Sequence, residues 1–265
     1  MHYVKNKRDK VGHCNICTNS CSLSWDHVPP KGSIEISTVE MRVLYKTLAG
    51  KNEDLKIEES QNGLKFRTIC RKCNEFLGHN YDPVIKDFAI SVGRYLKSNL
   101  TFPNIIHHRT KPVKLMRGIL GHILSAKVDF DKVQLDEQVR GFIFDKNAII
   151  PDDIHIFYWI YPYDYTIILR DVVMPSVRGD FSNSGFFQIF KYFPIAYIIT
   201  NLKTYEGLNE LTIYRHLSID EEVDIPIQLN RTEHYHWPEM VDNGNIVLAG
   251  PSASNAVFSV PKRRT

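Results

Sequence analysis

The five cysteines constrain the fold of this chain more than any other feature. All lie in the first 73 of 265 residues, and four form two pairs with the same spacing, Cys14-Asn-Ile-Cys17 and Cys70-Arg-Lys-Cys73. Each pair can bend two thiolates onto one tetrahedral ion through a tight turn, and Zn²⁺ accepts that geometry. We therefore expect a structural zinc site held by Cys14, Cys17, Cys70 and Cys73. Cys21 is then a spare thiol or a replacement for Cys17, and the alternative is two metal-free pairs of buried cysteines.

The cysteine count also bears on the cellular compartment. An odd number of cysteines argues against a disulfide framework, and the first fourteen residues lack the apolar segment of a secretory signal. No apolar run approaches the length of a membrane helix. We expect a cytoplasmic protein with no membrane partner.

Residues with side chains that can act in catalysis or bind a metal follow each of the two cysteine pairs. The segment Trp25-Asp26-His27-Val28-Pro29-Pro30-Lys31 follows the first cysteine pair, and Asn74 and His79 follow the second. Residues 64–69 alternate between apolar and polar, which predicts a strand that ends at Cys70.

Taken with the cysteines, these motifs resemble the HNH family of nucleases over residues 10–97. The resemblance implies a zinc-stapled ββα-metal domain in which His27 is the general base, while Asp26 and Asn74 hold a catalytic Mg²⁺ or Mn²⁺ ion on the scissile phosphate. Hard oxygen ligands suit such a cation. His79 has three alternatives: a further metal ligand, a phosphate contact or a surface histidine.

One position departs from the family pattern. The middle Asn of the family orients the histidine through its backbone or amide, but this register of the chain holds Lys65. Asn62 and Gln61 are the two candidates for that role. The segments Asp26-His-Val-Pro-Pro-Lys31 and Cys70-Arg-Lys-Cys-Asn74 are also similar to HNH domains of bacterial anti-phage effectors, which implies a role in antiviral defence.

The remaining sequence predicts a second, β-rich unit. Apolar spacing predicts helices over 83–98 and 113–126, whereas short strands are expected after residue 138. The expected strands are 141–144, 154–161, 165–173, 186–192, 195–200, 211–216, 245–249 and 256–260. We thus predict an α+β protein with an HNH domain in residues 1–105 and a mainly antiparallel β-rich α+β domain in residues 106–265.

The charge distribution favours a nucleic-acid partner for the first part of the chain. Residues 1–111 carry 18 Lys and Arg against 11 Asp and Glu, whereas residues 112–265 carry 15 against 19, although the whole chain has a formal charge of only +3. We expect DNA to be the partner. The candidate phosphate contacts are Lys31, Arg67, Arg71 and Lys72.

Three functions remain open at this point. The first is a metal-dependent HNH endonuclease that cleaves DNA, and the second is a zinc module that binds nucleic acid without turnover. The third makes the C-terminal domain a receptor for a nucleotide or protein activator, with the HNH domain as its output. A homodimer is a further expectation, because double-strand cutting by such enzymes needs two active sites.

Overall fold

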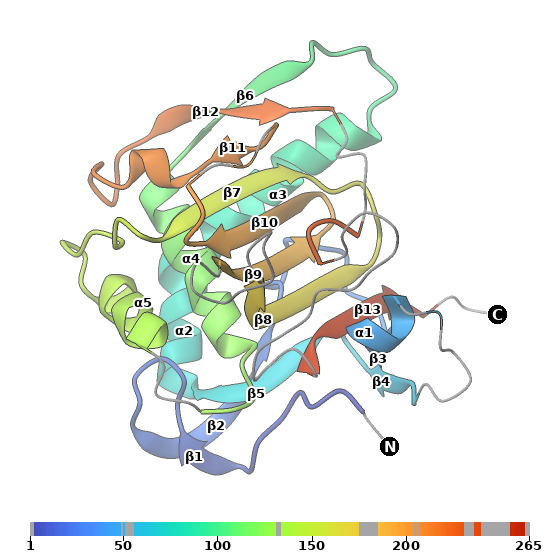
Figure 1. Ribbon diagram of the computed structural model, residues 1–265, viewed down its shortest axis with the longest axis vertical. Coiled ribbons are helices and arrows are strands. Elements are labelled where there is room, and N and C mark those ends of the chain that lie inside the picture. Colours follow the sequence, from blue (N-terminus) through green and yellow to red (C-terminus); the bar gives the residue numbers. More distant parts are fainter. Residues whose placement is uncertain are drawn as a thin grey trace.

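The computed structural model describes residues 3–48, 50, 56–130, 134–174, 185–203, 205, 207–230, 236–239 and 255–262 (Figure 1). Within these ranges the chain is an α+β fold in which all of the paired strands of the three sheets are antiparallel. None of the helices in the described part of the chain is long and apolar enough to cross a membrane.

The smallest complete unit is a hairpin followed by a helix. Strands β1 (Val11–His13), β2 (Ser20–His27) and β5 (Lys65–Cys70) form a three-stranded sheet, and helix α2 (Arg71–Asn80) begins directly after β5. The predicted strand that ends at Cys70 is confirmed. A bulge between Ser24 and Trp25 shifts the register of β2 against β5, so that His27 pairs with Lys65 at the end of the hairpin.

A larger sheet occupies the centre of the molecule, and eight strands of the described chain form it. In order across the sheet they are β11 (Asn209–Glu210), β7 (His155–Ile160), β10 (Ile195–Thr200), β9 (Gly185–Tyr192), β8 (Thr166–Met174), β13 (Val257–Pro261), β3 (Val39–Val43) and β4 (Glu58–Ser60). Strands β6 (Ile105–Thr110) and β12 (Val223–Gln228) form a separate pair. The Tyr158 hydroxyl donates a hydrogen bond to the Pro226 carbonyl and ties this pair to β7.

Both faces of the large sheet are buried, which explains why its central strands are apolar almost throughout. Successive side chains of a strand point to opposite faces. Tyr158 packs edge-on against Phe88 of helix α3 (Asp82–Lys97), whereas its neighbour Trp159 contacts Trp237 on the other face. Helix α4 (Pro112–Ser125) belongs to the same core as α3, and α1 (Leu44–Leu48) packs on the opposite side (Figure 1).

Two glycines let α4 approach α2 and α3 closely. A Cβ atom at Gly118 would lie 2.6 Å from Ile85 Cδ1, and one at Gly121 would lie 2.6 Å from Leu77 Cδ2. Real Cβ atoms essentially never lie so close, so a larger residue at either position would force the Ile85 or Leu77 side chain to shift within a well-packed core. The close contact places α4 directly behind the hairpin, where its other side chains reach β2.

Three sequence predictions differ from the structure or lie outside it. Residues 141–144 were expected to be a strand but end helix α5 (Gln134–Phe144), because a four-residue apolar run fits either structure and acidic residues begin this helix. Residues 211–216 contain a 3₁₀ turn, η1 (Thr212–Tyr214), in place of a strand. The predicted strand 245–249 lies outside the described residues. The helices predicted over 83–98 and 113–126 are confirmed as α3 and α4.

The large sheet contains strands from both of the predicted domains, residues 1–105 and residues 106–265. Strands β3 and β4 come from the segment between the two cysteine pairs, yet β3 pairs with β13 near the end of the chain. One hydrophobic core also joins residues of the hairpin, the helices and the large sheet. The segment between the cysteine pairs is therefore part of the central architecture.

Candidate metal centre and hairpin site

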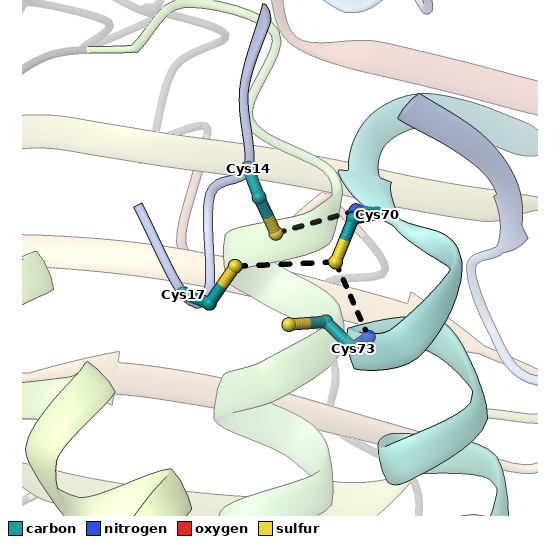
Figure 2. A group of neighbouring side chains, drawn as sticks. All are labelled: Cys14, Cys17, Cys70 and Cys73. Atoms are coloured by element: carbon teal, nitrogen blue, oxygen red, sulfur yellow. Dashed lines mark hydrogen bonds between the residues drawn. The ribbon is translucent and has the colours of Figure 1, made fainter. Parts of the chain in front are cut away.

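The four predicted cysteines meet at one point. Cys14 and Cys17 lie on the turn after β1, Cys70 ends β5, and Cys73 lies in the first turn of α2 (Figure 2). Their sulfur atoms all lie within 4.8 Å of one another, and Cys17 Sγ is 3.9 Å from Cys70 Sγ. Tetrahedral zinc with Zn–S bonds of about 2.3 Å places its sulfur atoms roughly 3.8 Å apart. The four cysteines can therefore hold a metal ion such as zinc.

The electrostatics of the cluster also suit a cation. A hydrogen bond from Cys73 lowers the pKa of the Cys14 thiol to about 4, whereas burial raises the pKa of Cys17. The backbone N–H of Cys70 also donates to Cys14 Sγ, and that of Cys73 donates to Cys70 Sγ (Figure 2). One thiolate is thus favoured and opposes the ionisation of its neighbours. A divalent cation removes that opposition, since a coordinated thiol is deprotonated by the metal.

Helix α4 is attached to the back of this cluster by two side chains. Asn15, between the first two cysteines, donates through Nδ2 to the Leu124 carbonyl at 2.8 Å, and Thr68 Oγ1 donates to the Ser125 carbonyl at 2.5 Å. These carbonyls belong to the last turn of α4, where backbone acceptors lack partners within the helix. The cysteine cluster and α4 are therefore held in a fixed relation.

His27 lies at the end of β2 and is half-buried. Its Nε2 atom lies 2.8 Å from the carbonyl oxygen of Asn62. Asn62 and Gly63 have φ values of +62° and +84°, the left-handed conformation that an Asn-Gly turn favours. Of the two candidates for the middle position, the structure thus brings Asn62 to His27, through its backbone. The Asn-Gly pair was the sequence signal for this turn.

Burial lowers the pKa of His27 below its ordinary value, and the nearby positive charge of Lys31 adds to this effect. The Asn62 carbonyl acts in the opposite direction without reversing it. Because a carbonyl oxygen only accepts hydrogen bonds, Nε2 carries the proton of the neutral ring. The Nδ1 atom then has a free lone pair at neutral pH.

Asp26 points the other way, into the core. It is 4% exposed, and its Oδ2 atom lies 3.2 Å from Nδ1 of His122 on α4. His122 Nε2 in turn lies 2.8 Å from Oδ1 of Asp82 at the start of α3. The sequence gives no sign of this contact, because an isolated histidine on an apolar helix carries no signal of its partners.

Asn74 and His79 lie beside a shallow cleft on α2. The cleft has a volume of about 680 Å³ and is lined by Ser24, Arg71, Asn74, Glu75, Gly78 and His79. Asn74 Nδ2 donates to the Trp25 carbonyl at 2.8 Å, which ties the helix to β2. His79 is exposed in this cleft.

The predicted cation ligands do not form a ready-made second metal site. Asp26 is buried against His122, and Asn74 is bonded to the backbone of β2. Among the described residues, the four cysteines are the one group of His, Cys, Asp and Glu that is close enough to hold a metal. These residues therefore do not fit a preformed Mg²⁺ or Mn²⁺ site.

The four predicted nucleic-acid contacts differ in whether their side chains already have a protein partner. Lys31 and Lys72 are exposed, whereas Arg71 pairs with Glu75 at 2.7 Å and Arg67 bonds to the Arg8 carbonyl. Trp25 was not among the predicted contacts and is 41% exposed on the hairpin. The Arg67 guanidinium lies 5.3 Å and the Lys65 ammonium 5.9 Å from the centre of its ring. Proteins that bind single-stranded nucleic acids combine exposed aromatic rings with nearby cations.

Comparisons with known proteins give no relative: no family model, no curated protein and no solved structure matches the chain.

Proposed function

We propose that this protein is a zinc-stapled nuclease of the HNH type that hydrolyses phosphodiester bonds of DNA, with His27 as the general base. The observation that carries the proposal is the hydrogen bond between His27 Nε2 and the Asn62 carbonyl. It fixes the ring at the end of a hairpin that the cysteine cluster joins to helix α2. The proposed metal of this cluster is Zn²⁺, held by Cys14, Cys17, Cys70 and Cys73.

The protonation state of His27 supports this role. With Nε2 protonated, Nδ1 takes a proton from a water molecule as its oxygen attacks the phosphorus. The P–O3′ bond then breaks, and the leaving O3′ takes up a proton from solvent water to become the 3′-hydroxyl. The lowered pKa keeps the ring neutral, and so able to act as a base, at physiological pH.

The outer face of the hairpin supports DNA as the substrate. Trp25 and His27 are two residues apart on β2, and Lys65 pairs with His27 in the neighbouring strand. A base stacked on Trp25 would place its phosphate near Lys65 and close to His27. Base stacking of this kind contributes about 1–3 kcal/mol per base.

A catalytic Mg²⁺ or Mn²⁺ ion at Asp26 and Asn74 is not part of the proposed mechanism, and the cleavage assay tests whether one is needed. Such an ion would have to compete with His122 for the Asp26 carboxylate. The mechanism above therefore has no step that depends on it. The role in antiviral defence and the homodimer remain predictions from the sequence.

The test incubates purified protein with supercoiled plasmid in Mg²⁺, Mn²⁺ or EDTA. We expect wild type to nick the plasmid and His27→Ala to lose this activity. His107→Ala, which changes an exposed histidine on β6, is the matched control and should cut as wild type does. Cleavage that survives in His27→Ala would refute the assignment of the base. Equal cleavage in EDTA would exclude the second ion.

The burial of Asp26 against His122 favours a second candidate function, a zinc module that binds DNA without cutting it. This candidate predicts no cleavage by wild type in any metal. Wild type would still shift a labelled DNA single strand in a gel, and Trp25→Ala would weaken that shift, since Trp25 is the exposed aromatic residue of the hairpin on which a base can stack.

A further inference from the structure

A cavity away from the metal centre lies between α3 and the large sheet. It has a volume of about 910 Å³, within the size range of sites for small organic ligands. Its walls come from the loop after β2, from α3, and from the β7–β8 and β9–β10 turns, with the end of β13 completing them. Segments distant in the sequence therefore build one cavity.

One buried polar group in this wall lacks a partner. Ser33 is 5% exposed, and its Oγ atom forms no hydrogen bond with any residue that the structure describes. A buried hydroxyl without a partner is costly, about 1–3 kcal/mol. The Oγ atom is itself shielded from solvent, so this hydroxyl belongs to the wall and not to the open space of the cavity.

Two cations of the last turn of α3 line the same cavity. Arg94 and Lys97 are exposed, stand three residues apart on one face of the helix, and make no ion pair within the described chain. Lys262 also lines the cavity but is paired with Glu59 at 2.5 Å. The two acids of the lining, Glu35 and Asp164, are exposed and lie on separate loops.

The remaining wall between these polar groups is apolar and includes a flat aromatic ring. Phe193 and Pro194 face α3, and the Lys97 ammonium lies 5.1 Å from the centre of the Phe193 ring. Gly93 allows this approach, because a Cβ atom there would lie 3.2 Å from Phe193 Cε1. Ile34 and Leu64 line the cavity as well.

We propose that this cavity is a binding site for a small organic anion that carries a flat apolar ring. The ring packs on Phe193 and Pro194, and the anionic group binds Arg94 and Lys97. The proposal concerns binding alone and does not depend on the nuclease function.

The test uses two fluorescent probes that differ in one anionic group. 8-Anilinonaphthalene-1-sulfonate carries a sulfonate, whereas N-phenyl-1-naphthylamine has the same rings without it. We expect wild type to bind the sulfonate at one saturable site. Arg94→Ala/Lys97→Ala should weaken that binding about tenfold or more while leaving the neutral probe within about twofold. Lys10→Ala/Lys203→Ala, which removes two exposed charges elsewhere, should bind both probes as wild type does.

A second variant locates the site. Ile34→Trp introduces a larger side chain from a partly exposed position of the lining, so we expect it to fold and to lose binding of both probes. The proposal is overturned if wild type shows no saturable site. It is also overturned if Arg94→Ala/Lys97→Ala keeps wild-type affinity for the sulfonate, or if Ile34→Trp binds both probes unchanged.

Discussion

Asp26 and His122 form a buried ion pair, with Oδ2 of the carboxylate 3.2 Å from Nδ1 of the imidazole. His122 is fully buried and also contacts Asp82. Although burial alone would lower the pKa of His122, the Asp82 and Asp26 carboxylates raise it to about 10. The ring is therefore an imidazolium at neutral pH, and it joins the residue before His27 to the last turn of α4 and the start of α3.

We expect His122→Gln to destabilise the protein by about 3–5 kcal/mol, because it leaves a buried carboxylate without its countercharge. Urea denaturation measures the change. His107→Gln is the control at an exposed position and should change the free energy of unfolding by less than about 0.5 kcal/mol. A similar loss in both variants would contradict the buried ion pair.

Combining His122→Gln with Asp26→Asn tests whether the two residues act as a pair. The double variant should lose less free energy of unfolding than the sum of the single variants, by about 0.5–3 kcal/mol. Strict additivity would mean that the 3.2 Å contact contributes nothing to stability.

The same pair predicts how stability depends on pH. A histidine whose pKa is higher in the folded state stabilises the protein fully below its unfolded pKa, about 6.5, and this contribution disappears as the pH rises to about 10. The difference in free energy of unfolding between wild type and His122→Gln should therefore shrink from pH 6.5 to pH 9.5. Chemical denaturation at several pH values measures it, and a constant difference would refute the raised pKa.

Local features of the fold could be predicted from the sequence. The two Cys-x-x-Cys pairs indicated a single cluster because the spacing itself limits the geometry, and the apolar repeat of α3 identified a helix with one buried face. The strand ending at Cys70 was equally clear. Each Cys-x-x-Cys pair, the α3 repeat and this strand is a local pattern, whereas the two cysteine pairs, separated by 52 residues, are linked by their matching spacing.

Long-range pairing could not be predicted in the same way. Nothing in residues 39–43 indicates that they pair with 257–261, because any apolar strand satisfies that edge of the sheet. The contact between Asp26 and His122 spans 96 residues and depends on Gly118 and Gly121 bringing α4 close to α2 and α3. The Asp26 side chain was assigned to a cation for this reason, although the fold gives it a protein partner.

The cysteine cluster predicts that substitutions of Cys70 and Cys21 differ in their effects on zinc content and Tm. Cys70→Ser should abolish the bound zinc, expected at one ion per chain, and lower Tm by roughly 10 °C or more, because the metal contributes folding energy. Cys21 lies outside the group of four, so Cys21→Ser should retain both the zinc and the wild-type Tm. Elemental analysis and thermal unfolding measure the two quantities. Zinc loss in Cys21→Ser would contradict the assigned ligands.

The lowered pKa of His27 predicts the pH profile of plasmid cleavage. A general base works in its neutral form, so the rate should rise with pH through a midpoint below 6.5 and then stay level across neutral pH. Lys31→Ala should move this midpoint to higher pH, because the positive charge of Lys31 contributes to the lowering. Lys10→Ala, which removes an exposed charge elsewhere, should leave it unchanged. A wild-type midpoint above pH 7 would show that another group accepts the proton. A midpoint that is the same in wild type and Lys31→Ala would show the same.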